Sequence, residues 1–351
     1  YRGENSKIVF DFDDPMGDST CVACGECVQA CPTGALMPAS IVDKDGVGHS
    51  KVDKKIDSVC PYCGVGCQIE YNVKDNKIKY VNGVDGPANK NRLCVKGRFG
   101  FDYVNNPERL TKPLIRIKDK AKDLHPNINF SNIHEYFREA SWDEALDYAA
   151  QGFLKLKKQR NGKSNLAGFG SAKCSNEEAY LFQKLIRTGF NTNNVDHCTR
   201  LCHASSVAAL LETIGSGAVT APFYEVEYSD VIIVIGANPT ENHPVAATFF
   251  KNAAKKGSKL IVMDPRGHSL KKHATHMLQF KPGSDVALLN SIMNVIVEEN
   301  LFNSQYIKKQ TEGFDKLRKH LMNYSPDIME NETGIDPELI REVARLYAST
   351  N

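Results

Sequence analysis

The sequence predicts an α/β protein in which two small cysteine-rich segments precede parallel-sheet α/β domains. Eight of the eleven cysteines lie in the first 94 residues, where they form two tight groups. Beyond these groups, short apolar runs typical of buried strands alternate with amphipathic helical patterns. Alternation of this kind indicates a parallel sheet, and such sheets bind their ligands at the carboxyl ends of the strands.

Length and composition favour an ordinary globular protein. The chain has 351 residues, 41% of them apolar and 25% charged, and its net charge is +2. No block of one charge sign occurs, so we expect no nucleic acid as a partner. No apolar run reaches the roughly 18 residues of a transmembrane helix, so we expect no membrane span. Grouped cysteines in a chain of this size favour metal ligation over a disulfide framework.

The first cysteine group has the spacing C-x₂-C-x₂-C-x₃-C-P over residues 21–32. In bacterial ferredoxins the first three thiolates of this run hold one [4Fe–4S] cluster, and the fourth serves a second cluster. Only one such run is present, so the fourth cysteine binds either the same cluster or one completed elsewhere. A zinc knuckle is the alternative, although its spacing is usually different. The predicted ligands are Cys21, Cys24, Cys27 and Cys31.

The second group has the spacing C-x₂-C-x₃-C-x₂₆-C. Strand patterns over 68–73 and 77–81 meet at the turn residues Asp75 and Asn76, which predicts a hairpin. The hairpin would return the last cysteine to the other three, so that one cluster binds all four. The predicted ligands are Cys60, Cys63, Cys67 and Cys94.

The remaining sequence predicts strands and helices in alternation. Ser141 and Glu144 have the spacing of a capping box at the start of a helix. Neither a G-x-G-x-x-G motif nor a Walker A motif occurs, so no standard NAD site or P-loop is predicted. A helix that ends at Lys255 separates the last two predicted strands. The other elements are helices over 141–159, 176–189, 207–211 and 337–348, and strands over 165–170, 231–235 and 260–263.

Loops at the predicted strand ends carry glycine together with polar residues. Glycine allows the backbone to approach a phosphate closely, and an aspartate can pair with the N1/N2 edge of guanine. Each loop alone is also compatible with ordinary turn chemistry. The candidate cofactor-binding residues in these loops are Gly170, Gly236, Asn238, Asp264, Arg266, Gly283 and Asp285.

The second cysteine group resembles the amino-terminal cluster domain of molybdenum/tungsten bis-pterin oxidoreductases. In that family a lysine two residues after the last ligand lies between cluster and pterin, and Lys96 matches it. A solvated surface lysine is the alternative. The glycine-containing loops match, in sequence order, the loops of the family that bind the pterin guanine dinucleotides.

A narrower resemblance covers essentially the whole chain. The ferredoxin-like front, the run Cys202-His203-Ala-Ser-Ser and the segment 236–247 are similar to the catalytic alpha subunit of cytoplasmic, NAD-linked formate dehydrogenases. The resemblance implies that Cys202 ligates molybdenum or tungsten and that His203 is the adjacent catalytic histidine. A thiolate suits such a metal. An inert thiol and a structural histidine are the alternatives.

The resemblance also implies a reaction and its partners. Formate would give CO₂, one proton and two electrons, by hydride transfer or with proton abstraction by His203. Electrons would pass by Lys96 to the second cluster, then the first, and on to iron–sulfur or flavin/NAD-binding subunits. The choice of metal, the acceptor and the preferred direction stay open, and a cytoplasmic location is expected.

Two other functions compete with this interpretation. A nitrate reductase-like bis-pterin enzyme is disfavoured because those enzymes do not place a histidine after the metal-binding cysteine. A non-catalytic electron-transfer subunit, like the large iron–sulfur subunit of respiratory complex I, is disfavoured by the Cys202-His203 pair and by the dinucleotide loops.

We expect four consecutive domains in a piece of a longer protein. The chain starts at Tyr1 without methionine and stops just after a helical pattern. The resemblance implies that the arginine that binds formate falls beyond Asn351, and any signal sequence would lie upstream of Tyr1. The predicted domains are an incomplete ferredoxin-type segment over 1–50, a cluster domain over 53–110, a first α/β part over 111–197, and an α/β dinucleotide-binding domain with the metal-ligand loop over 198–351.

Overall fold

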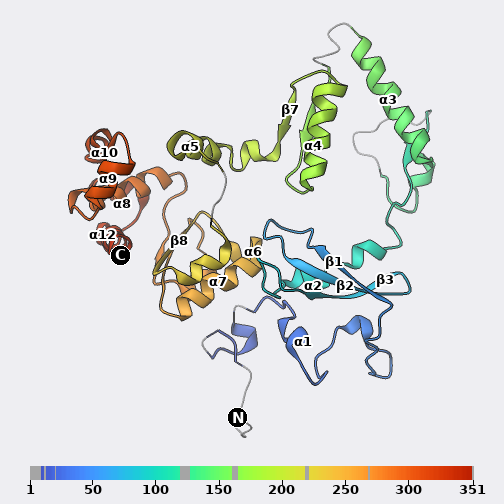
Figure 1. The fold of residues 1–351 in the computed structure, drawn as a ribbon, viewed down its shortest axis with the longest axis horizontal. Helices are drawn as coiled ribbons and strands as arrows, with labels where there is room; N and C mark the ends of the chain where they lie inside the picture. The colour runs from blue at the N-terminus through green and yellow to red at the C-terminus, as the bar shows by residue number, and fades with distance from the viewer. Residues whose placement is uncertain are drawn as a thin grey trace. The chain divides into compact units, whose positions relative to one another are not determined.

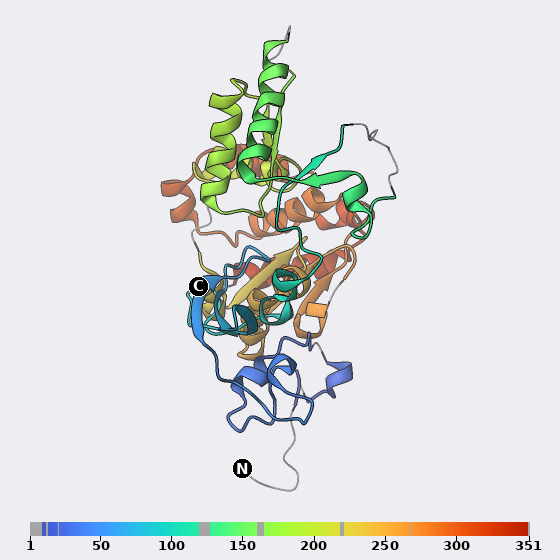
Figure 2. The same ribbon diagram turned by 90° about the vertical axis from the view of Figure 1, so that its right-hand side faces the viewer.

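The chain folds into two compact units that are interleaved in sequence. The computed structural model describes residues 9–11, 13–19, 21–118, 127–159, 165–217, 221–267 and 269–349. The larger unit combines Tyr1–Phe99 with Ala221–Asn351, and the smaller unit is Gly100–Thr220 (Figure 1 and Figure 2). These units are not the four consecutive domains that the sequence predicts, and those domain boundaries stay a prediction.

An antiparallel sheet in the larger unit follows the predicted hairpin. Its strands are β1 (Lys54–Val59), β2 (Gln68–Lys74) and β3 (Lys77–Gly83), in the order β1-β2-β3. Asp75 and Asn76 join β2 to β3 with φ angles of 52° and 54°. Two residues with positive φ form the tight turn whose twist matches that of the paired strands. The hairpin prediction is therefore confirmed.

The second sheet of the larger unit is parallel and has helices on both faces. Its strands are β8 (Val231–Ile235), β9 (Lys259–Met263) and β10 (His276–Leu278), in the order β10-β9-β8. Alternate residues of β9 point to opposite faces. Ile261 and Met263 pack in a core with α8 (Asp285–Glu298) and α12 (Pro337–Ala348), whereas Leu260 and Val262 face the side of α7 (Pro244–Lys255). The α/β prediction for this segment is confirmed.

One predicted helix of this unit is broken. The segment between β8 and β9 forms α6 (Pro239–Asn242) and then α7, with His243 at φ −137° and ψ 61° between them. Proline disfavours a helical conformation of the residue before it, so Pro244 ends one helix and starts the next. The other helices of the unit are α1 (Glu26–Ala30), α2 (Val95–Phe99), α9 (Ser304–Gln310), α10 (Phe314–Leu321) and α11 (Pro326–Thr333).

Among its described residues, the smaller unit has two short strand pairs and three α-helices. β4 (Leu114–Arg116) pairs antiparallel with β5 (Phe137–Glu139), and β6 (Gly168–Gly170) pairs parallel with β7 (Val195–His197). A small core of Leu166, Ile186 and Phe190 supports the parallel pair. The helices are α3 (Trp142–Lys158), α4 (Asn176–Lys184), which continues as a π-helical turn over Leu185–Gly189, and α5 (Ala204–Ile214).

Only half of the predicted capping box forms at α3. The Ser141 hydroxyl accepts a hydrogen bond from the Glu144 backbone N–H at 3.1 Å, as predicted. The Glu144 carboxylate instead pairs with Arg138 on β5. A charged donor outcompetes the neutral backbone N–H for that carboxylate. In the part of the chain that the structure describes, no helix is both long enough and apolar enough to cross a bilayer.

Candidate functional site

Four predicted ligands surround one small cavity in the larger unit. Cys60, Cys63, Cys67 and Cys94 line it together with apolar side chains and the first two residues of α7, Pro244 and Val245. Cys60 follows β1, Cys67 precedes β2, and the Cys60 N–H donates to the Cys67 carbonyl at 2.8 Å. The sheet therefore returns the chain to Cys94, at the start of α2, as the hairpin prediction required.

The four cysteines at this cavity form an all-thiolate set, although within the described residues no three cysteine, histidine or carboxylate side chains are grouped as they would be around a single metal ion. Burial, together with the neighbouring cysteine sulfurs, raises the pKa of the Cys67 thiol to about 12. Burial also raises the pKa of the Cys60 thiol, while Lys96 lowers it. Four crowded thiolates are unfavourable without a cationic group between them, and an all-thiolate set is the usual ligand set of a [4Fe–4S] cluster. Lys96 lies close enough for its charge to act on this set.

The backbone around the cavity is held by a buried asparagine. The Asn89 amide oxygen accepts from the Gln68 N–H at 3.0 Å, and its amide nitrogen donates to the carbonyls of Gln68, Val84 and Arg92 at 3.1–3.2 Å. Its side chain is fully buried. Asn89 therefore joins the start of β2 to the loop that leads to Cys94.

Gly97, on α2, borders the cavity. A Cβ added there would lie 3.5 Å from the Cys60 sulfur and 3.4 Å from the Leu93 side chain. These are ordinary van der Waals distances, so the space beside the Cys60 sulfur admits a methyl group.

The ferredoxin-like segment presents its cysteines around α1. Gly25 precedes this helix with φ 72°, and a Cβ there would overlap the side chains of Arg98 and Phe99. Burial raises the pKa of the half-buried Cys24 thiol, and a hydrogen bond with the Glu26 backbone lowers it; the charges of the Glu26 carboxylate and of Cys21 raise it, and that of Arg98 lowers it. Cys24 therefore lies close enough to Cys21, another predicted ligand, for the two sulfur atoms to interact electrostatically.

Cys31 has a different environment from Cys24. Its sulfur lies 3.5 Å from the Thr33 hydroxyl, and this hydrogen bond, together with backbone groups of residues 33, 35 and 36, lowers the pKa of the Cys31 thiol to about 7. The predicted membership of Cys31 in the first cluster or in another one stays open. Cys21 and Cys27 are exposed.

An arginine that sequence reasoning did not single out joins the two cysteine segments. Arg98 is 3% exposed and donates from Nε to the Cys24 carbonyl at 2.9 Å. Its guanidinium also bonds Glu26 and Gln29, both on α1. The available signal was its spacing: Arg98 follows Cys94 by four residues, which places both on one face of a helix.

The predicted dinucleotide loops meet at the carboxyl ends of the parallel strands. Gly236 follows β8 with φ 58°, and the buried Asn238 and Asp264 follow β8 and β9. The Asp264 carboxylate accepts from the Arg266 N–H at 2.8 Å. The loops are joined because Ser269 donates to Thr240, which donates to the Asn238 side chain.

The third loop is tied to the second. The Gln279 side chain, just after β10, donates to the Pro265 carbonyl at 3.0 Å. Gly283 then adopts φ 89°, and the exposed Asp285 begins α8. The structure thus brings the loops after β8, β9 and β10 to one edge of the sheet, where parallel α/β proteins bind ligands.

The Cys202-His203 pair lies in the smaller unit, after β7. A 3₁₀ turn over Cys198–Leu201 presents Cys202, and His203 is the N-cap of α5; both side chains are exposed. The N–H groups of both residues donate to the Thr199 carbonyl at 3.0 and 3.1 Å. The turn therefore presents an accessible thiol and an accessible imidazole from one short, hydrogen-bonded segment.

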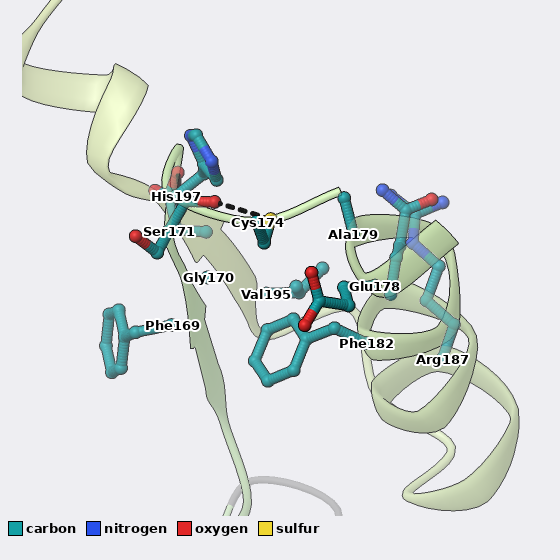
Figure 3. Close-up of a pocket in the computed structure, with 12 residues that line it drawn as sticks. Phe169, Gly170, Ser171, Cys174, Glu178, Ala179, Phe182, Arg187, Val195 and His197 are labelled. Carbon is teal, nitrogen blue, oxygen red and sulfur yellow. Dashed lines mark hydrogen bonds between the residues drawn. The ribbon is translucent and has the colours of Figure 1, made fainter. Parts of the chain in front are cut away.

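The predicted residue Gly170 lies beside the same turn. The Cys198 sulfur accepts from the Ala172 N–H at 3.3 Å, which joins the loops after β6 and β7. A cavity of about 500 Å³ opens there, with Gly170 and His197 in its wall. Figure 3 shows Glu178 and Phe182 projecting from α4 toward the strands. Sequence reasoning did not predict this cavity.

Arg200, near the pair in sequence, is held by an ion pair. Its Nε lies 3.1 Å from the Asp196 carboxylate on β7. This contact gives Arg200 a role within the turn.

The chain matches three protein families. The molybdopterin oxidoreductase family matches residues 109–334, the molybdopterin oxidoreductase Fe4S4 domain matches 53–106, and the 4Fe-4S binding domain matches 18–37. All eight cysteines of the two groups lie within the two cluster-domain matches. These matches support iron–sulfur and molybdopterin cofactors.

Several curated proteins are similar to this chain. The F420-dependent formate dehydrogenase 1 subunit alpha of Methanococcus maripaludis is 40% identical over 84% of this chain and 41% of that protein. Probable oxidoreductase YjgC of Bacillus subtilis is 34% identical over 100% of this chain and 38% of that protein. A putative formate dehydrogenase of Staphylococcus aureus is 34% identical over 96% of this chain and 36% of its own length. The chain thus spans less than half the length of these relatives.

A solved structure has the same fold. Acetylene hydratase from Pelobacter acetylenicus superposes with a TM-score of 0.69 at 23% sequence identity, over 83% of this chain and 38% of that one. The fold, the cysteine sites and a family match that covers more than half of the chain agree. The chain belongs to the molybdopterin oxidoreductase family.

Proposed function

We propose that this chain is part of the catalytic subunit of a formate dehydrogenase, which converts formate to CO₂ or the reverse. The observation that carries the proposal is the 40% identity to a formate dehydrogenase alpha subunit over 84% of this chain. In this chain Cys202 and His203 are adjacent, as the proposed metal site requires. The reaction releases CO₂, one proton and two electrons from each formate.

In this proposal, Cys202 and His203 act together at the metal. The Cys202 thiol is exposed, so it is accessible to a metal as a ligand. When bound, the molybdenum or tungsten bis-pterin centre supplies the acceptor for the two electrons. His203 would hold formate through its ring N–H or take up the proton that formate releases.

The strand-end loops would hold the guanine dinucleotides. Gly236 and Gly283 have positive φ and leave their backbone open to a phosphate, and Arg266 offers a charged donor. Asp264 and Asp285 offer carboxylates to a guanine edge. Gly170, at the end of β6, would offer its backbone to the cofactor. Asn238 would fix the loop that follows β8.

The two cysteine segments would pass the electrons on. Cysteine-bound clusters supply one-electron transfer, and Lys96 provides a positive charge next to the second cluster. Iron–sulfur or flavin/NAD-binding subunits in the cytoplasm are the proposed recipients. The name of the M. maripaludis relative specifies F420 for that protein.

Formate-dependent reduction of a viologen dye by the full-length protein tests this function. We expect activity in the parent protein and a loss of more than about 100-fold in Cys202→Ala, beyond the effect usual for residues around a metal ligand. Cys198→Ala changes a cysteine of the same turn and should keep most of the activity. Full activity in Cys202→Ala would contradict the assigned ligand.

Metal analysis separates the proposal from an electron-transfer subunit. Molybdenum or tungsten in the full-length protein, besides iron, is the expected result. Iron without either metal would contradict the proposed enzyme and favour the non-catalytic function. Nitrate-dependent rather than formate-dependent dye oxidoreduction would favour a nitrate reductase-like enzyme.

A further inference from the structure

Arg98 connects one predicted ligand of each cluster through hydrogen bonds. Its backbone N–H donates to the carbonyl of Cys94 at 3.0 Å. Its side-chain Nε donates to the carbonyl of Cys24 at 2.9 Å, across 74 residues of sequence. A single residue therefore holds the backbone of both cysteine segments.

The two NH₂ groups of Arg98 bind α1, the helix that follows Cys24, and Nη1 also reaches the Val81 carbonyl on β3 at 3.5 Å. Nη1 donates to the Gln29 side-chain oxygen at 2.8 Å, and Nη2 pairs with the Glu26 carboxylate. The same Glu26 oxygen accepts from the Leu93 N–H at 2.8 Å, directly before Cys94. The ion pair thus also links both segments.

Burial and packing make this connection specific. The Arg98 side chain is 3% exposed, whereas that of Glu26 is 39% exposed. Gly25 packs so closely on Arg98 that any side chain at position 25 would overlap it. The planar guanidinium with several fixed donors suits this arrangement, and a lysine offers only a point charge.

We propose that Arg98 is a positioning residue for electron transfer between the two clusters, and that its charge and that of Glu26 set the midpoint potential at the first cysteine segment. The proposal rests on the cluster-binding part of the proposed function, and not on formate as substrate. One electron given up at the four-cysteine site is accepted at the first segment. No bond forms or breaks, and Arg98 keeps its proton.

The two charges have opposite effects at the first segment. Reduction adds one negative charge, which a nearby guanidinium favours and a nearby carboxylate disfavours. Both groups lie at Cys24: Arg98 Nε donates to the Cys24 carbonyl at 2.9 Å, and Glu26, two residues after Cys24, pairs with the Arg98 guanidinium. Neutralising Arg98 should lower the midpoint potential there, and neutralising Glu26 should raise it. A purely structural role for the pair would not give shifts of opposite sign.

Electron paramagnetic resonance during a redox titration of the full-length protein tests the proposal. Arg98→Gln should lower the midpoint potential of the first cluster, and Glu26→Gln should raise it. If Arg98→Gln fails to bind the first cluster, Glu26→Gln and Arg98→Lys carry the test. A fall or no change in Glu26→Gln would overturn the assigned electrostatic role.

Arg98→Lys separates charge from position. Lysine keeps the charge but cannot reproduce the bonds to Cys24, Glu26 and Gln29 together. We expect a midpoint potential nearer to that of the parent than to that of Arg98→Gln. We also expect weaker magnetic coupling between the two reduced clusters, because their separation is less well fixed. Unchanged coupling in Arg98→Lys would overturn the positioning role.

Arg92→Gln is the matched control. Arg92 lies two residues before Cys94, but its Nη1 donates to Thr248 at 3.0 Å and its guanidinium stacks on Phe249, 4.7 Å from the ring centre. The substitution Arg92→Gln therefore removes an arginine from the same segment and leaves the contacts of α1 unchanged. A shift as large as that of Arg98→Gln would overturn the specific role of Arg98. The redox titration uses dithionite, not formate, as the reductant. A failure to oxidise formate would therefore refute the proposed activity but would leave the measured midpoint potentials valid.

Discussion

Arg98 is a charged side chain almost wholly removed from solvent, and its bonds to Cys24, Glu26 and Gln29 compensate for that burial. A buried charge that loses its partner is strongly destabilising, whereas a fully paired one specifies a single arrangement. At the scale of residues, the larger unit is organised by a few polar side chains of this kind. Asn89 is another buried polar side chain. It carries no charge, and its four side-chain hydrogen bonds all go to backbone groups.

Removing the Asn89 amide should destabilise the larger unit. Asn89→Ala leaves one N–H and three carbonyls without this partner inside the protein. At about 1 kcal/mol for each typical bond, we expect a loss of about 2–4 kcal/mol in the free energy of unfolding. Denaturant titration measures the change.

Asn82→Ala is the control for that measurement. Asn82 is half-buried on β3, outside the Asn89 network. Its loss should cost less than about 1 kcal/mol, as is usual for positions away from such networks. Equal effects of the two substitutions would contradict the role given to Asn89.

Glu227 is one of the carboxylates that make the stability of the larger unit sensitive to acid. A hydrogen bond from Lys256 holds the pKa of Glu227 below its ordinary value of 4.5. Below pH 4.5 the unfolded chain binds this proton more readily than the folded one, so the stabilisation present above pH 4.5 is lost as the pH falls. We expect Glu227→Gln to have a shallower decline in unfolding free energy below pH 4.5. A decline as steep as in the parent would argue against this pair.

At the scale of elements, α1 and α2 come together through Gly25. Its φ of 72° is unfavourable for other residues, and an added Cβ would overlap Arg98 and Phe99. We expect Gly25→Ala to separate the ferredoxin-like segment from α2 and to reduce the iron content to that of one cluster. Iron analysis and paramagnetic resonance measure the loss.

Gly46→Ala separates backbone strain from overlap. Gly46 has φ 79°, close to that of Gly25, but an added Cβ there meets no atom within 4 Å. The cost is then limited to about 1 kcal/mol of backbone strain. Gly46→Ala should retain both clusters. If Gly46→Ala and Gly25→Ala both lost the first cluster, overlap of the added Cβ with Arg98 and Phe99 would not explain the loss.

At the scale of the whole molecule, the division into two units predicts a local effect of iron removal. A group that binds only the folded state stabilises the unit that holds it. Chelation of iron should therefore increase amide hydrogen exchange in β1, β2 and β3, and leave α3 and α4 largely unchanged. Mass spectrometry resolves the peptides, and an equal loss of protection in both units would contradict the division.

Much of the local structure could be predicted because its causes are close in sequence. The cysteine spacing and the Asp75-Asn76 turn predict the hairpin, and the apolar run Val231–Ile235 predicts β8. The break at His243 also has a local cause, because proline disfavours a helical conformation of the residue before it. The prediction of one continuous helix up to Lys255 did not take Pro244 into account. The Glu144 carboxylate pairs with Arg138 instead of closing the capping box, because a strand placed the stronger partner within reach.

The sequence by itself determined the cysteine spacing of both cluster segments, the parallel α/β pattern, and the adjacent Cys202 and His203. Only the tertiary structure decided that Arg98 reaches Cys24 and that Pro244 and Val245 close the cavity of the second segment. The physical reason is distance along the chain. Short spacings are fixed by turn and helix geometry, whereas contacts between residues 24 and 98, or 60 and 244, depend on how whole sheets and helices pack.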